Sequence, residues 1–359
     1  MASLWQRLTG APVSETRAAQ PTIPTRLATS VTPDSSLTLT AVYRAVQIIA
    51  TPVSKMNIDT FRYATGLEAK IENPLLVNRP NLDDTRRDFL FQTVVSLALE
   101  GNAFWYKQYG SNGQVNNLTI LPASAVSISQ DSATARKTYN YEGKSYTSNE
   151  IEHLRLFPRA GYLRGVSPIE SCSADLAAAI DLRDYAKNWF SSAGVPTGIL
   201  KTGQMVNQAD AELITNNWHN KQQNRQIAVL GSGFEFQEIQ VDPAKAQFTE
   251  QQAQAVQQIA RLFGVPARLL LTGVDGTSDT YSNLSDENQV FYRHTLMAYT
   301  DAISDALSNC LPRGTRSEFN FESLFRADQQ NRFQMWNTAL AGEAFMTVEE
   351  VRNKEGLNV

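Results

Sequence analysis

Apolar and polar positions in the first third of the chain predict two amphipathic helices. The first lies in LTAVYRAVQIIATPVSKM, where apolar side chains recur with helical spacing. They are Val42, Ala45, Val46, Ile49 and Val53. Pro52 is expected to end or kink this helix. The second helix lies in DDTRRDFLFQTVVSLALEG, which begins with acidic residues and stops at Gly101, as capped helices do.

Alternating patterns between and after these helices predict strands. NIDTFRY alternates as a strand does, and NAFWYKQY, GSNG and QVNNLTIL have the signature of a hairpin. A second hairpin is predicted in TYNYEGKSYT, with its turn at Glu142 and Gly143, and EIEHLRLF closes the region as a strand. The first half therefore predicts an α+β domain.

The second half is dominated by longer helical patterns. Ser167 and Pro168 are good N-cap and first-turn residues, and the pattern they open continues to Gly194. A helix of about 28 residues would be ~42 Å long. A small strand–helix–strand unit follows, then a second long helix that stops at Gly264 and Pro266, a loop, and a third long helix over 282–311. SEFNFESLF predicts a strand, and the remaining residues predict helices.

Length and composition indicate which class of protein this is. The chain has 359 residues, 42% hydrophobic and 19% charged, which indicates two or three globular domains. Residues 1–38 are predicted to be an extended N-terminal arm because the segment is rich in Pro, Thr, Ser and Ala without a period. Cys172 and Cys310 lie in helical patterns, so we expect buried thiols rather than a disulfide. With no apolar run near ~18 residues and no signal peptide, we expect a soluble, cytosol-made protein.

Motifs for catalysis or metal binding fail on inspection. YEGKSY ends like a phosphate-binding loop, but Thr138 stands where the required glycine would be, and the segment reads as a hairpin. Three histidines, His153, His219 and His294, are scattered without ligand spacing. Asp301 and Asp305 can share a helix face, which we interpret as a solvated surface. We therefore expect no catalytic residue, no cofactor and no metal.

An ordered set of segments resembles a known family. In the second half, GVSPIES, WFSSAGVPTGIL, VLGSGFEFQEI, QIARLFGVPARLL, TYSNL and MTVEEVRNKEGL occur in this order. In the first half, LLVNRPN, LALEGNAFWYKQYGSNGQVNNLTILPASAVSI and IEHLRLF agree with the same family. Together they cover roughly residues 40–357 and resemble the portal proteins of tailed bacteriophages, in their shorter-chain branch.

The resemblance implies an α+β portal-type subunit. Its implied parts are a wing of α/β structure over 39–166 and 283–328, a stem of long helices over 167–194 and 244–264, a small α/β clip over 195–243, a tunnel loop region over 265–282 and a short helical crown over 329–359. It also implies a ring of identical subunits, usually a dodecamer, that forms a DNA channel at one capsid vertex. Because the sequence ends at GLNV, we expect any larger crown to be small or missing.

The residues are compatible with a ring. The first stem helix offers Ile169, Cys172, Leu176 and Ile180 on one face, with Ala174, Ala177, Ala178 and Ala179 allowing close approach. The second offers Ala255, Val256, Ile259, Leu262 and Phe263, while its other faces carry Gln251, Gln252, Gln254, Gln257 and Gln258. Such a glutamine-rich surface suits hydrogen bonds between subunits, although a solvated amphipathic helix remains the alternative.

Charge favours a conduit over a binder. The formal net charge is −4, which argues against a tight, sequence-blind DNA-binding protein. Duplex DNA carries one negative charge per ~1.7 Å, so a ~42 Å stem would face about 25 phosphates. A basic lining would hold the DNA firmly. A tunnel that must pass every sequence should therefore be neutral or acidic.

The tunnel loop is the segment we expect to face DNA. Its predicted contact residues combine flexible glycines, short hydroxyl side chains and two carboxylates. They are Thr272, Gly273, Val274, Asp275, Gly276, Thr277, Ser278 and Asp279. We expect a mobile collar that touches the DNA backbone loosely; the alternative is a surface loop that joins two helices.

The clip is expected to dock other proteins of the particle. Trp218, His219, Lys221 and Arg225 are the candidate contacts. The resemblance implies a terminase large subunit, a head–tail adaptor and the major capsid protein as partners, with no membrane. It places the chain in the virion, and in the host cytoplasm during assembly. Two other hypotheses stay open, a different ring or adaptor protein of the virion and a nucleotide-binding enzyme.

Overall fold

A computed structural model describes residues 31–64, 67–190, 198–202, 207–223, 234–238, 248–270, 289–321, 329–341 and 346–355. The chain divides into two compact units, residues 1–176 with 256–359, and residues 177–255. Both boundaries fall inside helices, between Leu176 and Ala177 and between Ala255 and Val256. Across the described ranges, no helix combines the length and apolarity needed to cross a bilayer.

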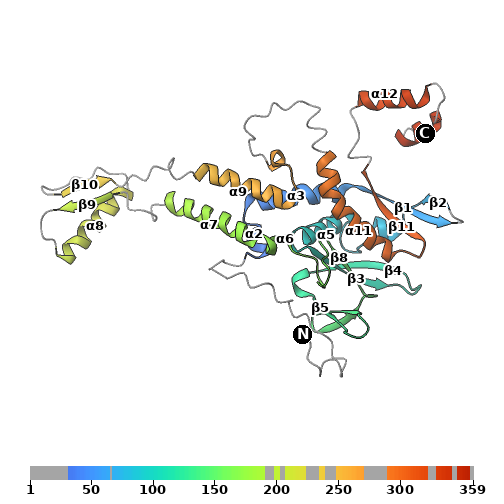
Figure 1. Ribbon diagram of the computed structural model, residues 1–359, viewed down its shortest axis with the longest axis horizontal. Helices are drawn as coiled ribbons and strands as arrows, with labels where there is room; N and C mark the ends of the chain where they lie inside the picture. The colour runs from blue at the N-terminus through green and yellow to red at the C-terminus, as the bar shows by residue number, and fades with distance from the viewer. Residues whose placement is uncertain are drawn as a thin grey trace. The chain divides into compact units, whose positions relative to one another are not determined.

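Two helices form the centre of the first unit. After a short helix α2 (Pro33–Ser36), helix α3 (Thr40–Lys55) packs against α5 (Arg86–Glu100), as Figure 1 shows. All five apolar residues predicted to share one face of α3 are buried. Thr85 caps α5 by accepting a hydrogen bond from the backbone of Asp88, and Gly101 ends it with φ of 67°. The predicted end of this helix at Gly101 is therefore confirmed, and its N-cap, Thr85, directly follows the two acidic residues of the predicted start.

Pro52 is expected to end or kink α3, and of these two outcomes the first is wrong. The helix continues for nearly one further turn, to Lys55, and the backbone N–H of Met56 donates to the Pro52 carbonyl. Proline removes one donor and crowds the preceding turn, which weakens a helix without always stopping it. Burial of Ile49 and Val53, both 0% exposed, stabilises the turn that contains Pro52.

Both predicted hairpins are present. β3 (Asn102–Tyr109) pairs with β4 (Val115–Leu121) and also with β8 (Ile151–Arg155), which gives the antiparallel order β4-β3-β8. A second sheet contains β5 (Ser127–Gln130), β6 (Lys137–Tyr141) and β7 (Lys144–Thr147), after a 3-10 turn at Ala123–Ala125. Glu142 and Gly143 have φ of 48° and 76°, as a two-residue hairpin turn requires.

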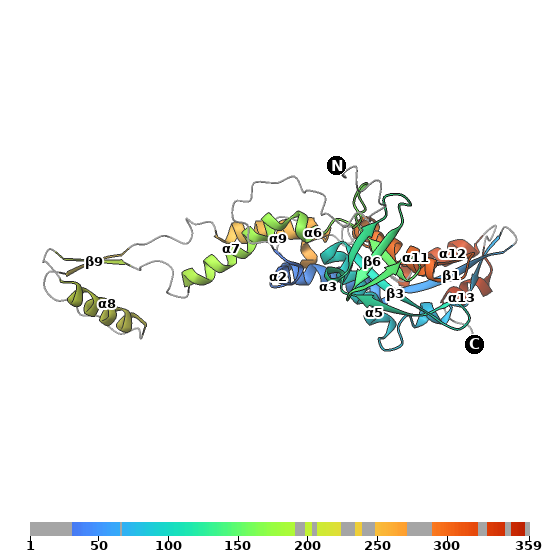
Figure 2. The same ribbon diagram turned by 90° about the horizontal axis from the view of Figure 1, so that it is seen from below.

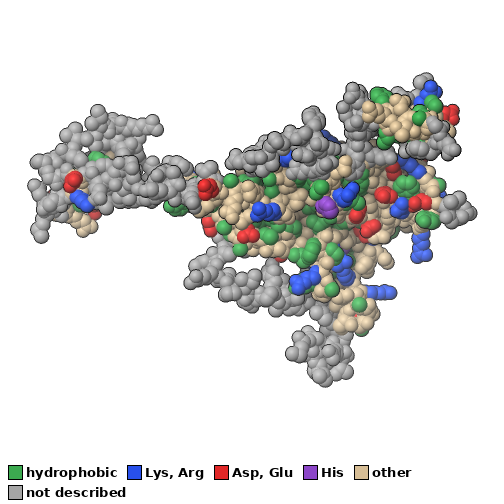
Figure 3. Space-filling view, turned by 45° about the horizontal axis from the view of Figure 1, so that its top comes forward, with side chains coloured by type: hydrophobic (Ala, Val, Ile, Leu, Met, Phe, Trp, Pro, Cys, Tyr) green, Lys and Arg blue, Asp and Glu red, His purple; other side chains and the backbone are tan. Residues whose placement is uncertain are grey.

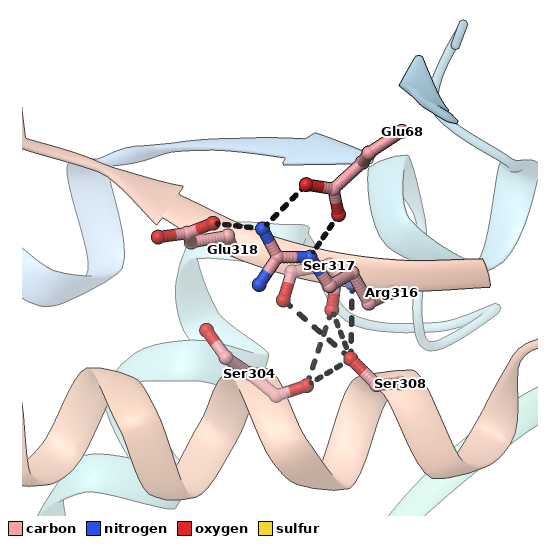
Figure 4. Close-up of polar contacts among 6 residues, drawn as sticks. All are labelled: Glu68, Ser304, Ser308, Arg316, Ser317 and Glu318. Carbon is pink, nitrogen blue, oxygen red and sulfur yellow. Dashed lines mark hydrogen bonds and ion pairs between the residues drawn. The ribbon is translucent and has the colours of Figure 1, made fainter. Parts of the chain in front are cut away.

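A third sheet joins an early segment of the chain to a late one. β1 (Asn57–Ala64) pairs with β2 (Leu67–Ile71) on one side and with β11 (Thr315–Asn320) on the other, and α4 (Leu75–Asn78) follows β2. Figure 4 shows how β11 is held. Arg316 forms ion pairs with Glu68 of β2 and with Glu318. Segments separated by more than 240 residues therefore share one sheet.

The late helical segment packs on this sheet. From residue 289 the chain is helical, passes through a π-helical turn η3 (Tyr292–Leu296), and continues as α11 (Met297–Cys310). Ser308 connects α11 to β11 because its hydroxyl donates to the Ser304 carbonyl (2.7 Å) and accepts from the Ser317 backbone N–H (2.9 Å), as Figure 4 shows. The described part of the predicted third long helix is thus helical but not uniformly α.

The predicted helix over 167–194 is interrupted. Ser167 and Pro168 start it as expected, but the first segment is only α6 (Pro168–Ser171), and Cys172 has non-helical angles before α7 (Ser173–Phe190) begins. The Ser171 hydroxyl donates to the Ser167 carbonyl (2.8 Å), a local bond that competes with regular helical geometry. The described helix α7 has 18 residues, or ~27 Å of helix, and residues 191–194 of the predicted helix lie outside the described residues.

The remaining elements follow the predictions. In the second unit, β9 (Gly198–Thr202) and β10 (Phe234–Glu238) form an antiparallel ribbon, and Figures 1 and 2 both show α8 (Gln208–Gln223) beside it. Helix α9 (Phe248–Phe263) leads to a 3-10 turn η2 (Ala267–Leu270). The last helices are α12 (Gln329–Leu340) and α13 (Val348–Glu355).

The two cysteines are free thiols, as expected. Cys310 is buried, and burial raises the pKa of its thiol to about 12. Cys172 is only half-buried, so the expectation of burial holds for one of the two.

Candidate channel and subunit-contact surfaces

The predicted tunnel loop, Thr272–Asp279, lies outside the described residues, but both of its flanks are described. Helix α9 stops at Gly264, as predicted, and it does so in a recognisable capping motif. Gly264 has φ of 63°, its N–H donates to the Arg261 carbonyl (3.2 Å), and the Val265 N–H donates to the Ala260 carbonyl (2.9 Å). These two bonds define a Schellman cap.

The far flank is tied to this cap. Thr295, in the π-helical turn, donates its hydroxyl to the Gly264 carbonyl at 2.7 Å. A Cβ on Gly264 would lie 2.6 Å from that hydroxyl oxygen, so only glycine fits beside it. The turns η2 and η3 also both contact α3. The chain therefore leaves and returns to the same anchored region on either side of residues 271–288.

We expect Thr295→Val to lower the free energy of unfolding by about 1 kcal/mol, since it removes one hydrogen bond while keeping the branched shape. Thr295→Ser keeps the hydroxyl and is the matched control, with a smaller expected loss. Urea unfolding at one fixed protein concentration measures both. Equal losses in the two variants would show that packing of the Thr295 methyl group, rather than the hydrogen bond, joins the flanks.

The predicted polar face of α9 is confirmed as an exposed surface. The five glutamines are exposed, whereas Ile259 and Phe263 are each 4% exposed. Ala260 is also buried, and Ala255, Val256 and Leu262 are half-buried. A helix with long neutral amides outside and an apolar stripe inside can offer many hydrogen bonds to a neighbour without a strong electric field.

Helices α6 and α7 show a similar division. Ile169 and Leu176 are buried, at 0% and 1% exposure, while Cys172 and Ile180 of the predicted face are half-buried. Of the four predicted alanines, Ala177 is buried, Ala179 is half-buried, and Ala174 and Ala178 are exposed. The exposed alanines leave space for close approach by another helix.

The charges on α7 and α9 nearly cancel. α7 carries Asp175, Asp181 and Asp184 against Arg183 and Lys187, and α9 carries Glu250 against Arg261, so their net charge is −1. Arg183 is further occupied by an ion pair with Asp184 (3.0 Å). Figure 3 shows acidic and basic side chains interspersed over the visible face of the described residues. These helices therefore offer no basic track for a DNA backbone.

The docking residues predicted for the clip are only partly described. Trp218, His219 and Lys221 lie on α8, where Trp218 is half-buried, and Arg225 lies outside the described residues. The structure thus places three of the four on one helix of 16 residues and leaves their docking role a prediction.

The first sheet is joined to α6 where two stretches of backbone cross. The spacing of residues in the sequence gives no sign of this crossing. Asn102 accepts from the Gly165 N–H (2.7 Å) and donates to the Gly165 carbonyl (2.9 Å). Ser167, the N-cap of α6, donates to the Leu99 carbonyl (2.9 Å). The crossing is so close that a Cβ on Gly101 would lie 2.3 Å from the Val166 carbonyl oxygen. We call Gly101, Asn102, Gly165 and Ser167 the stem joint.

Among the described titratable groups, His153 of β8 packs against an aromatic ring. His153 is half-buried and its ring stacks on that of Phe104, with centroids 4.3 Å apart, and desolvation lowers the pKa of its imidazole to about 2. Asp301 and Asp305 are exposed, as expected of a solvated helix face. Within the described ranges, no three His, Cys, Asp or Glu side chains are grouped to hold a metal ion.

Comparisons with known proteins agree with the resemblance. The profile of the family described as phage portal protein matches residues 40–356. The "Probable portal protein" of Streptomyces phage phiC31 is 23% identical over 353 residues, covering 91% of this chain and 76% of that protein. The portal protein of Enterobacteria phage HK97 is 24% identical over 347 residues, covering 91% and 81%.

Among solved structures, the fold is similar to a chain in the neck of a native gene transfer agent (GTA) particle computed with C12 symmetry. The TM-score is 0.65 at 21% identity, and the match covers 97% of this chain and 96% of that one. The family profile spans nearly the whole described fold, from the start of α3 to the end of α13. The chain therefore belongs to the phage portal protein family.

Proposed function

We propose that this chain assembles into a closed ring, a dodecamer, which forms the channel for double-stranded DNA at one vertex of a capsid. The family match over residues 40–356 carries the proposal. The similar neck chain comes from a neck computed with C12 symmetry, which supports twelve subunits. The near-neutral α7 and α9 and the glutamine face of α9 support a wall that contacts neighbours and DNA without holding DNA tightly.

In this proposal the subunit has named parts. The first unit contains the wing and the second contains the clip, with α7 and α9 as stem helices that link them in sequence. Residues 272–279 form the tunnel loop that touches DNA. The clip docks a terminase during packaging and a head–tail adaptor afterwards, and the wing meets the capsid protein. The ring assembles in the host cytoplasm and stays in the virion.

We infer that the chain itself catalyses no reaction and that ATP hydrolysis belongs to the terminase. The YEGKSY form of the phosphate-loop alternative loses its support because Gly143 lies in the β6–β7 hairpin turn rather than at the start of a helix. The other candidate loop, GVDGT over 273–277, lies outside the described residues. The purified protein should therefore show no ATPase activity above a buffer blank. Hydrolysis that persists through purification would revive the enzyme hypothesis.

Electron microscopy of the purified protein tests the ring. We expect closed rings with an axial hole and twelvefold class averages. A compact monomer at micromolar concentration, or a stack without a hole, would overturn the proposed function. A closed ring too small for duplex DNA would favour another ring protein of the virion instead.

Charge reversal tests the tunnel loop. We expect Asp275→Lys/Asp279→Lys to leave rings intact and to slow DNA packaging roughly tenfold, because each subunit would add cations that bind passing phosphates. An in vitro packaging assay with terminase measures the rate. The control is Asp83→Lys/Glu349→Lys, which makes the same charge change at two exposed residues of the first unit. Equal rates for both variants would remove the loop from the mechanism.

A further inference from the structure

A cavity of about 270 Å³ lies in the first unit, away from the helices assigned to the stem. Three stretches of chain form it: β1, β2 and the start of α4; the β3–β4 turn; and the end of α11 with the residues before β11. Pockets for whole small molecules are usually about 300–1,000 Å³. A cavity of this size suits one or two side chains of a protein segment. We call it the wing pocket.

The lining combines an apolar floor with one charge. The apolar residues include Ile71, Leu76, Val115, Leu311 and Pro312. Arg62 is the single charged residue of the lining. Its side chain forms no ion pair with any described residue, whereas Arg316 on the neighbouring strand is held by Glu68 and Glu318. A cation without a local carboxylate beside an apolar floor is complementary to an acidic, apolar ligand.

The rim is already ordered to bind a peptide backbone. Asn112, Gln114 and Asn116 line the wing pocket. Side-chain amides can donate to and accept from peptide groups, and the Asn112 amide already donates to the Gln114 side chain (3.3 Å). Their turn is fixed because Gly110 donates to the Gln114 carbonyl (2.8 Å) and Gln114 donates to the Asn112 side chain (3.0 Å). A preordered rim reduces the entropy lost on binding.

The opening also offers an apolar contact. Leu75 lines the wing pocket and is 76% exposed, so a partner can cover it without displacing anything in the subunit. The segment that carries it is fixed below, since Asn73 donates to the Ile58 carbonyl (2.7 Å) and accepts from Thr60 (2.8 Å). A mobile wall is therefore not needed to admit a ligand.

We propose that the wing pocket binds a short segment of a different protein, in which a branched apolar side chain stands next to a carboxylate. The apolar side chain would lie on the floor between Leu76 and Leu311. The carboxylate would pair with the guanidinium of Arg62, and the segment's backbone would bond to the amide rim. This site lies outside the channel and clip assigned above, so it goes beyond the proposed function.

Peptide binding to the full chain tests the site. The probe is N-acetyl-leucyl-aspartyl amide, and its neutral match is N-acetyl-leucyl-asparaginyl amide, both titrated at low salt by calorimetry or NMR. We expect the aspartyl peptide to bind with a millimolar Kd, roughly tenfold tighter than the asparaginyl peptide. Arg62→Gln should abolish that difference, and Arg87→Gln, an equal charge change at an exposed helix position, should preserve it.

A second variant tests the apolar contact without risk to the core. Leu75→Ser should weaken the binding of both peptides to a similar degree, because in this proposal Leu75 contacts an apolar part of the ligand and not its carboxylate. Binding of neither peptide, or equal binding of both, would overturn the proposal. A third outcome would also overturn it: neither peptide binds, and Arg62→Gln changes the number of subunits in the ring. The occupant of the wing pocket would then be another copy of this chain. These results do not depend on whether the ring conducts DNA.

Discussion

Gly101→Ala is expected to lower the free energy of unfolding by about 3–5 kcal/mol, the largest effect we predict for one methyl group. Two costs combine. Gly101 has φ of 67°, which side chains with a Cβ rarely adopt, and the new Cβ would lie 2.3 Å from the Val166 carbonyl oxygen. That atom is backbone and is fixed by the stem joint, so it cannot move aside cheaply. Urea unfolding followed by tryptophan fluorescence measures the loss.

Gly113→Ala separates the two costs. Gly113 has a similar φ of 72°, but no atom lies within 4 Å of its added Cβ. Its expected loss is about 1 kcal/mol, from the backbone alone. If both variants lose the same amount, the chain relaxes freely at the stem joint, and the close crossing of Gly101 and Val166 is not a constraint on the fold.

Lys107→Met is expected to cost about 3–5 kcal/mol, for an electrostatic reason. The Lys107 ammonium, with its side chain 7% exposed, pairs with Glu152 at 2.9 Å and donates to the Ser148 carbonyl. Asn309 of α11 donates to the other oxygen of the same carboxylate (2.9 Å), so the pair also joins the first sheet to α11. Without Lys107, the Glu152 carboxylate is left shielded from water with no cation.

The double variant Lys107→Met/Glu152→Gln should recover most of this loss, because it removes the unpaired charge as well. Lys70→Met is the matched control for an exposed pair. Lys70 binds Asp59 at 2.8 Å, but its side chain is 59% exposed, and such pairs contribute less than about 1 kcal/mol. A similar loss in the free energy of unfolding for Lys107→Met and Lys70→Met would mean that burial of the Lys107–Glu152 pair does not affect stability.

Local patterns predicted the elements well because their causes are local. The β6–β7 turn needed only Glu142 and Gly143, and the end of α9 needed only Gly264 and the residues before it. The break at Cys172 was missed because helical periodicity continues across it, while the Ser171 hydroxyl bonds to the backbone there. A hydrogen bond between neighbouring residues leaves no trace in the spacing of apolar positions.

Long-range features could not be predicted from spacing. Lys107 occupies an apparently ordinary polar position in NAFWYKQY, and only the fold brings Glu152 to it. The wing pocket likewise unites residues 62–76, 112–116 and 310–315. The candidate channel surface could be predicted better, because the exposed glutamines of α9 follow directly from its amphipathic pattern. The tunnel loop and the clip contacts stay predictions.

The pairing of β1 with β11 also has a consequence for synthesis. Asn57 lies opposite Asn320, so the β1 edge is made long before its partner. At ribosomal rates of about 5–20 residues per second, it waits roughly 13–50 s with one side unpaired. Nascent chains would then be vulnerable to edge-to-edge aggregation. Production of this protein should therefore depend on holdase chaperones that cover the β1 edge until β11 is made.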